Sequence, residues 1–194
     1  MIITNRKIYR TLPPPYEREI LRYAGAPESD EASRALLFSC IEEGQSAVFG
    51  AVVYAETDVL ICDEDTLGLW NIEVKSRDLC RALSGCARAV LFVATVGAES
   101  GRLISRYSRI SPSRALMLSA YFSERVERVC DVFQSEYAGV CTPRVSAGYG
   151  DIPIELQRDI FTLLCPERSI GVCLTESLGM TPEKSVSAIF GIRS

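Results

Sequence analysis

The feature that most constrains the fold of this chain is a run of apolar residues that recur at helical spacing behind Pro112. A proline is favoured at the first position of a helix, so the pattern predicts a long helix over residues 112–137. One stripe of this helix is apolar and must face a core. The members of that stripe are Leu118, Phe122, Val126, Val129 and Phe133.

The opposite side of the same helix carries small and mostly uncharged side chains. At about 100° per residue, that side holds Leu116, Ala120, Ser123, Glu127 and Cys130. A helix that is apolar on two sides is expected to be buried. We therefore predict that this helix is the central element of the fold.

The rest of the chain mixes strand and helix patterns. Residues 47–75 are rich in β-branched and aromatic side chains, and polar turns at 56–58 and 63–65 divide them into a predicted β-meander. Further strands are expected over residues 89–96, 170–175 and 185–192. Shorter helices are expected over residues 17–24 before Gly25, 29–43 with Ser29 as N-cap, 76–83 with Ser76 as N-cap, 98–106 and 153–164.

Strict strand–helix–strand alternation is rare in this pattern, so we expect an α+β fold rather than a doubly wound α/β fold. The chain has 194 residues and contains neither a low-complexity linker nor an internal repeat. This length suits one domain over residues 1–194. Its first 90 residues form the helical and meander region, and residues 91–194 hold the segments with candidate chemistry.

Composition excludes several functional classes. The formal net charge of −4 argues against nucleic-acid binding, which needs a basic patch that displaces counterions. The chain contains no histidine, which excludes imidazole-based triads, helical zinc motifs and an axial imidazole for a cofactor. Any chemistry must come from carboxylates, thiols, arginine, tyrosine or a bound molecule, and we expect no metal site.

The eight cysteines do not form a Cys-x-x-Cys pair, which excludes zinc-ribbon and thioredoxin motifs. We expect most of them to be reduced, buried small hydrophobes in a cytoplasmic protein. The longest charge-free run, residues 44–55, has 12 residues, whereas a membrane span needs about 20. We therefore expect neither a signal peptide nor a membrane segment.

Glu127 lies at the margin of the small helix face, one turn before Asp131. Like charges at this spacing are mildly unfavourable, by a few tenths of a kcal/mol, so a positive group is expected beside Glu127. Arg114, Arg128 or another arginine could supply it in a structural ion pair. Alternatively, the ammonium group of a ligand could supply it.

The segment 141–153 is the second candidate site. It contains Arg144, then Gly148 and Gly150 on either side of Tyr149. The glycines permit positive φ or a close approach of the backbone to a ligand. Arg144 could hold a carboxylate or phosphate through two parallel hydrogen bonds, or it could bind carbonyl groups of its own loop. No dinucleotide or phosphate-loop signature accompanies it.

Several motifs in one order resemble the reactivation domain of cobalamin-dependent methionine synthase. They are Arg144-Val-Ser-Ala-Gly148-Tyr149, which follows that family's Arg-x-x-x-Gly-Tyr pattern, then Leu174-Thr-Glu-Ser177 and Ser185-Val-Ser187. The resemblance begins near Phe92-Val-Ala-Thr-Val-Gly97 and covers about the last hundred residues. The family usually has proline after the tyrosine, where this chain has Gly150.

The resemblance implies a domain that binds S-adenosylmethionine, with a twisted antiparallel sheet and a long central helix. It implies that Arg144 holds the methionine carboxylate and that main-chain groups near Val145 hold the adenine. Tyr149, beside Gly148, would line the pocket next to the sulfonium and is the candidate catalytic residue. The acidic residue on the central helix that faces the ligand corresponds to Glu127.

The resemblance also implies the reaction and its partners. The domain would present the methyl group of S-adenosylmethionine for reductive remethylation of cob(II)alamin on a methionine synthase or related corrinoid protein. A flavodoxin- or ferredoxin-type protein would supply the electron. The chain would then be an accessory subunit that binds and aims the methyl donor, with no catalysis by itself and with the cobalamin on another polypeptide.

Two alternatives remain open from the residues alone. The chain could bind S-adenosylmethionine as a sensor or scaffold module without methyl transfer. It could also be a thiol redox protein that uses its eight cysteines.

Overall fold

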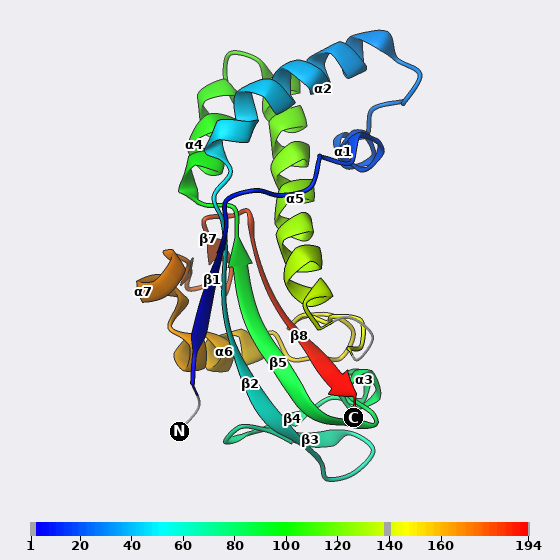
Figure 1. Ribbon diagram of the computed structural model, residues 1–194, viewed down its shortest axis with the longest axis vertical. Coiled ribbons are helices and arrows are strands. Elements are labelled where there is room, and N and C mark those ends of the chain that lie inside the picture. Colours follow the sequence, from blue (N-terminus) through cyan, green and yellow to red (C-terminus); the bar gives the residue numbers. More distant parts are fainter. Residues whose placement is uncertain (1–2, 138–140, 194) are drawn as a thin grey trace.

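The computed structural model describes residues 3–137 and 141–193 (Figure 1). Seven α-helices and one 3₁₀ helix occur in this part of the chain. They are α1 (Glu17–Ala24), α2 (Glu31–Gly44), η1 (Gln45–Ala47), α3 (Arg77–Ala82), α4 (Ala98–Tyr107), α5 (Pro112–Ser135), α6 (Leu156–Leu164) and α7 (Pro166–Ile170). None of the described helices has the length and apolar character needed to cross a bilayer.

The strands form one large sheet and one small hairpin. They are β1 (Asn5–Tyr9), β2 (Gly50–Ile61), β3 (Thr66–Leu69), β4 (Ile72–Lys75), β5 (Cys86–Thr95), β6 (Cys173–Leu174), β7 (Met180–Thr181) and β8 (Ser185–Arg193). The large sheet has the order β4-β3-β2-β5-β8, and β6 pairs with β7 in the hairpin. Every one of these strand pairs is antiparallel.

The long strand β2 has two partners on the same side. Its first half pairs with β1, from Gly50 opposite Tyr9 to Tyr54 opposite Asn5. Its last residues pair with β3, where Val59 lies opposite Leu69. Figure 1 shows the β3–β4 hairpin at one end of the sheet and helices α2 and α4 at the other.

Both faces of the sheet are covered, so alternate residues of the central strands enter two separate cores. Phe92 of β5 and Phe190 of β8 enter the core formed with α1, α2, α4 and α5. Leu91 and Ile189, their immediate neighbours in sequence, enter the core formed with α3 and α6. This alternation follows from the twofold period of a strand and explains why residues 89–96 form a nearly continuous apolar run.

The long helix α5 lies across the first of these faces, as its apolar stripe predicts. The stripe residues are all buried, and Phe133 packs against Phe92 and Phe190 with ring centroids 5.2 and 6.1 Å apart. Pro112 occupies the first turn, where its missing N–H costs no hydrogen bond. The predicted α+β fold with an antiparallel sheet and a long central helix is therefore confirmed.

Several predicted boundaries were wrong. Residues 56–58 are not a turn, because β2 continues through them. The N-cap of α2 is Asp30 rather than Ser29, because the Asp30 side chain accepts a hydrogen bond from the Ser33 N–H at 3.0 Å. Helix α6 begins at Leu156 rather than at residue 153. Of the strand expected over residues 170–175, only Cys173–Leu174 is paired. Strands β1 and β7 were not predicted.

Candidate functional site

The two charged residues singled out in the sequence form one ion pair. Arg144, on the loop after α5, donates from Nη2 to Oε2 of Glu127 on α5 at 2.6 Å. Its Nη1 donates to Asp131 Oδ1 at 2.9 Å and to Gln134 Oε1 at 3.1 Å. The guanidinium therefore spans two turns of the helix and removes the repulsion expected between Glu127 and Asp131.

Arg144, rather than Arg114 or Arg128, supplies the positive charge beside Glu127. Arg114 pairs with Glu43 at 2.9 Å. Burial alone would lower the pKa of Arg144, but its interactions with Glu127, Cys130 and Asp131 together outweigh burial and raise that pKa. The side chains are 24% exposed for Arg144 and 41% exposed for Glu127, so the pair remains accessible from solvent.

The loop after Arg144 is attached to the sheet and then turns sharply. The Val145 N–H donates to the Ile189 carbonyl at 2.9 Å, and the Ile189 N–H donates to the Val145 carbonyl at 2.8 Å. Gly148 has a φ of +82°, and a Cβ there would lie 2.9 Å from Cδ1 of Ile154. Tyr149 follows at the tip of the loop and is 69% exposed.

The last part of the loop is fixed to the N-terminus of α3. Asp151 accepts hydrogen bonds from the Ser76 hydroxyl at 2.5 Å, the Arg77 N–H at 2.9 Å and the Asp78 N–H at 3.1 Å. Gly150 has a φ of +58°, and a Cβ there would lie 2.1 Å from Asp78 Oδ2. Proline is confined to φ near −65°, so a proline at position 150 could not adopt the conformation that this loop has.

A groove of about 390 Å³ runs along the small face of α5 and reaches Glu127. Its other wall is formed by the start of β8, and Tyr23 of α1 contributes to its rim. Burial and the negative charge of Glu127 raise the pKa of Tyr23. The residues that line the groove are Tyr23, Leu116, Ser119, Ala120, Ser123, Val126, Glu127, Glu183, Lys184, Ser185 and Val186.

Sequence reasoning identified Glu127 at this groove but missed Lys184 and Ser119. Both residues follow from features that the sequence does contain. Ser119 continues the small helix face one turn before Ser123, and Lys184 immediately precedes the Ser185-Val-Ser187 motif. Only the folded chain brings the two together, with Lys184 Nζ 2.9 Å from Ser119 Oγ.

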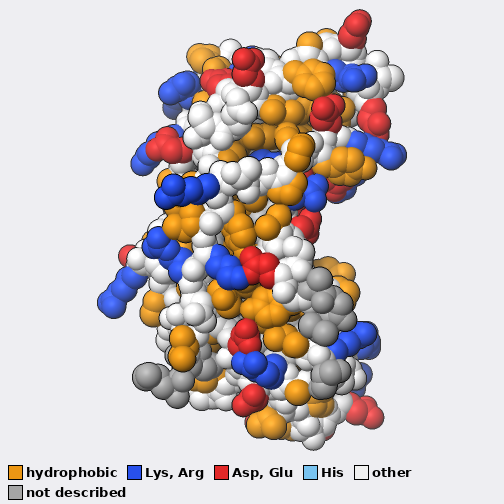
Figure 2. Space-filling model, viewed as in Figure 1, with side chains coloured by type: hydrophobic (Ala, Val, Ile, Leu, Met, Phe, Trp, Pro, Cys, Tyr) orange, Lys and Arg blue, Asp and Glu red, His pale blue; other side chains and the backbone are white. Residues whose placement is uncertain are grey.

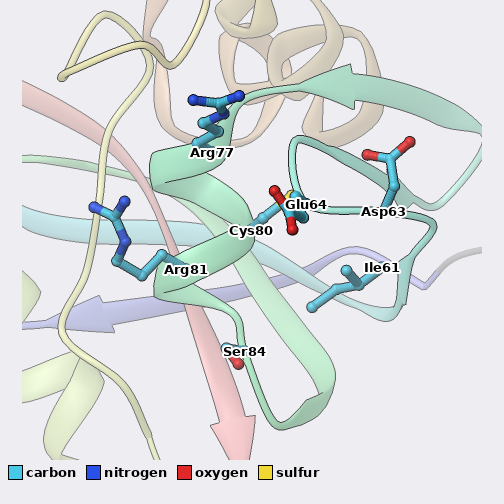
Figure 3. A pocket seen from close by; sticks show the side chains of 7 residues that line it. All are labelled: Ile61, Asp63, Glu64, Arg77, Cys80, Arg81 and Ser84. Carbon is cyan, nitrogen blue, oxygen red and sulfur yellow. The ribbon is translucent and has the colours of Figure 1, made fainter.

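A second cavity, of about 490 Å³, lies between α3 and the end of β2 (Figure 3). Its charged side chains do not converge, since Figure 3 shows Arg81 and Asp63 on opposite sides of α3. Cys80 lines it as well, but burial raises the pKa of this thiol. None of the predicted site residues lines this cavity.

Surface charges and cysteine thiols are the remaining candidates for reactive groups. Figure 2 shows lysine and arginine side chains interspersed with aspartate and glutamate over the visible face. Within residues 3–137 and 141–193, no cluster of three or more potential metal ligands occurs. All eight cysteines are free, and burial raises the pKa of Cys40 and Cys130, which disfavours their thiolate forms.

Cysteine burial is less uniform than expected. Four cysteines are buried, at positions 40, 80, 86 and 130, and Cys141 and Cys173 are half-buried. Cys62 and Cys165 are exposed. We expected most of the cysteines to be buried, and four of the eight are.

Comparisons with known proteins identify relatives of this fold and of its second half. Residues 117–193 match the family model of the vitamin B12 dependent methionine synthase activation domain. A crystal structure of the MetH reactivation domain bound to AdoHcy is similar, with a TM-score of 0.58 and 17% sequence identity over 89% of this chain and 69% of that chain. No curated protein sequence matches the chain. The resemblance inferred from the motifs is thus confirmed, and the matched residues include Glu127, Arg144, Val145, Gly148 and Tyr149.

Proposed function

We propose that this chain binds S-adenosylmethionine in the groove along α5 and presents its methyl group to a corrinoid on a partner polypeptide. The observation that carries the proposal is the pairing at 2.6 Å of Glu127, which lines that groove, with Arg144, which does not itself line it. The two residues have opposite charges, as a site for the amino-acid end of this ligand requires. The similarity to a reactivation domain bound to AdoHcy supports the same ligand class.

The ion pair suits an exchange with a zwitterionic amino-acid group. The ligand ammonium would replace Arg144 as the partner of Glu127, and the ligand carboxylate would replace Glu127 as the partner of Arg144. Because Arg144 keeps Asp131 and Gln134 as further acceptors, the guanidinium stays oriented during the exchange. In the bound state each charge would again have a partner, which limits the free-energy cost of opening the pair.

The loop 145–149 would hold the reacting end of the ligand. The positive φ of Gly148 and the closeness of Ile154, whose Cδ1 would lie 2.9 Å from a Cβ there, fix the turn that presents Tyr149. Tyr149 projects from the loop tip, and its exposed ring would contact the sulfonium side of the ligand and the incoming partner. Tyr149 is therefore the residue that we place nearest the transferred methyl group, with Val145 behind it on the sheet.

Bound S-adenosylmethionine would supply an electrophilic methyl group, which a reduced corrinoid would accept as the S–CH3 bond breaks and S-adenosylhomocysteine leaves, without needing a base from this chain. The protein therefore needs to anchor and aim the ligand rather than move a proton. The chain has no histidine, so an imidazole ligand to cobalt would have to come from the corrinoid-binding partner. We expect a flavodoxin- or ferredoxin-type donor to supply the electron that reduces the cobalt.

Thermal unfolding with and without S-adenosylmethionine tests the binding step. At ligand concentrations near 100 times Kd the native state gains about 2.7 kcal/mol, which raises Tm by several degrees. Arg144→Ala should abolish the shift, whereas Arg128→Ala on α5 should retain it because Arg128 pairs with Glu124 at 3.5 Å and Asp131 at 3.7 Å rather than with Glu127. Absence of a shift in the wild-type protein at millimolar ligand would refute the proposal.

Methyl transfer separates the reactivation function from a binding module. The assay combines the chain with S-adenosylmethionine, a corrinoid-binding methionine synthase fragment and a low-potential reductant, and measures transfer of the labelled methyl group. Transfer that depends on this chain supports the proposed function. Binding without transfer would instead indicate a sensor or scaffold module.

A further inference from the structure

The β3–β4 hairpin has a tryptophan at a turn position that does not favour it. Trp70 and Asn71 form the two-residue loop between the paired strands β3 and β4. Trp70 has a φ of +56°, a left-handed conformation that glycine and asparagine adopt readily and bulky side chains rarely do. Thr57 of β2 holds the loop in place, because its Oγ1 accepts a hydrogen bond from the Trp70 N–H at 2.8 Å. The turn itself therefore gives no reason for a tryptophan.

The side chain of Trp70 is also incompletely buried. Trp70 is 43% exposed, and the nearby Leu60 of β2 is 68% exposed. A half-exposed ring gains only part of the free energy that a buried tryptophan contributes to folding. Strained backbone occurs preferentially at functional sites, and tryptophan is enriched at protein interfaces. Both observations indicate an interaction surface at this hairpin.

A hollow of about 340 Å³ lies beside Trp70, at the end of the sheet away from α2 and α4 (Figure 1). Leu60 lies opposite Gly68 in the β2–β3 pair, so no side chain stands directly across from it. Leu60, Gly68 and Trp70 all line the hollow. The hollow shares no lining residue with the groove along α5, so it is a separate site.

The charges that line the hollow leave one carboxylate without a partner. Arg88 of β5 lies opposite Asp58 but pairs with Glu56, at 2.7 Å between Nη2 and Oε2. Within residues 3–137 and 141–193, the Asp58 side chain forms neither an ion pair nor a hydrogen bond. The paired charges of Arg88 and Glu56 cancel, and the charge of Asp58 does not. The hollow is therefore complementary to a cationic group.

An arginine side chain fits this combination of groups. A guanidinium stacks on aromatic faces, and tryptophan is its strongest aromatic partner. Its methylene stem covers apolar surface, which the exposed Leu60 provides, while its charge stays beside a carboxylate such as Asp58. A lysine ammonium has the charge but lacks the planar group that stacks. Tryptophan and arginine are also enriched among the residues that contribute most to protein–protein binding.

We propose that the hollow beside Trp70 docks an arginine side chain of a partner protein. The guanidinium lies between the Trp70 ring and the Asp58 carboxylate, and its stem lies on Leu60. Because this surface is separate from the groove along α5, a partner can be held here whether or not the groove is occupied. The strained turn presents the ring in the position that docking requires.

Trp70 is the single tryptophan of the chain, so its fluorescence reports on this site alone. The probe is a capped glycine–arginine–glycine peptide, and its control is the same peptide with citrulline, which has a similar shape but no charge. The arginine peptide should change the Trp70 emission saturably. The citrulline peptide should bind about fivefold more weakly, which corresponds to an exposed cation–π contact plus an exposed ion pair.

Two carboxylate variants test the role of charge in the same titration. Asp58→Asn should weaken the binding of the arginine peptide and leave that of the citrulline peptide unchanged. Glu73→Gln is the matched control, because Glu73 of β4 lies opposite Gly68 but does not line the hollow. Its effect on the arginine peptide should be small. Equal affinities for the two peptides in the wild-type protein, or equal losses in the two variants, would overturn the proposal.

Trp70→Asn tests the ring itself, with peptide binding followed by NMR chemical shifts. Asparagine tolerates positive φ, so the hairpin should fold, and the binding of the arginine peptide should be lost. Retained affinity would overturn the proposal, as would wild-type emission that does not respond to the arginine peptide. Emission that shifts with protein concentration alone, together with dimers in sedimentation, would show that a second copy covers the surface and would overturn the assignment to a partner protein. None of these outcomes affects the proposed binding of S-adenosylmethionine in the groove.

Discussion

In the Arg144–Glu127 ion pair, two residues that we propose to bind the ligand are each other's partners. Neither side chain is fully buried, so each can exchange its partner for a ligand group at moderate cost. Asp131 and Gln134 hold the guanidinium near the groove even when Glu127 is engaged elsewhere. A structural ion pair and a ligand site are therefore compatible roles for the same two residues.

Gly150 is the residue whose identity the loop depends on most directly. Gly150→Ala combines the strain of a positive φ with a Cβ 2.1 Å from Asp78 Oδ2. We expect it to lower the free energy of unfolding by roughly 2–3 kcal/mol, measured by urea unfolding. Gly25→Ala is the matched control, because its φ of +64° is similar but nothing lies within 4 Å of the new Cβ. That control should cost about 1 kcal/mol, and equal losses in the two variants would contradict the role of the Asp78 contact.

At the scale of elements, the long helix was predictable because several independent signals agree. Pro112 marks its start, the stripe around Phe133 has the right period, and the small face made Glu127 a candidate site residue. The partner of Glu127 was not predictable, since helix spacing says nothing about a loop residue 17 positions away. The sequence signals for Arg144 were its place before the two glycines of the loop and the motif order, and neither predicts its contact with Glu127.

The turn predicted at residues 56–58 was wrong for a different reason, since β2 continues through these residues. Glu56 and Thr57 are typical of a turn, but neighbouring elements satisfy their polar groups within the strand. Glu56 pairs with Arg88 at 2.7 Å and accepts a hydrogen bond from the Tyr137 hydroxyl at 3.0 Å. Thr57 Oγ1 accepts from the Trp70 N–H at 2.8 Å. Tertiary contacts therefore override the local preference, and no single-segment pattern contains them.

The attachment of the site loop to α3 should depend on pH. The hydrogen bond from Ser76 holds the pKa of Asp151 below its ordinary value of 3.8. The lowered pKa means that its contribution to stability is full above about pH 4 and is lost as the pH falls through the native-state value. Asp151→Ala should therefore lower Tm at pH 7, and the difference from wild type should shrink below pH 4.

Asp159→Ala provides the control for that measurement. Within the described residues, Asp159 forms neither a side-chain hydrogen bond nor an ion pair, although it also lies near a helix N-terminus. Its effect on Tm should be small at both pH values. A Tm difference for Asp151→Ala that stays constant from pH 7 to pH 3 would contradict the capping role.

For the whole molecule, the distribution of thiols distinguishes a ligand-binding domain from a thiol redox protein. The exposed Cys62 and Cys165 should react quickly with an aromatic disulfide reagent in the native state. The four buried thiols, at positions 40, 80, 86 and 130, should react only after denaturation. Rapid reaction of a buried thiol in the folded protein would favour the redox alternative.

The arrangement of α5 against the sheet determines where the groove forms. The sheet separates two cores, and α5 covers one face with its apolar stripe while its small side chains border β8. Small residues at this border leave the space that larger ones would fill. The groove is thus a consequence of the same two-sided helix pattern that places α5 at the centre of the fold.

A crystal structure of the chain with S-adenosylmethionine tests the central claim most directly. We predict that the ligand lies in the groove between α5 and β8, with its ammonium within hydrogen-bond distance of Glu127 and with Arg144 released from Glu127 toward the carboxylate. A ligand bound elsewhere, with the 2.6 Å contact between Arg144 and Glu127 unchanged, would contradict the account.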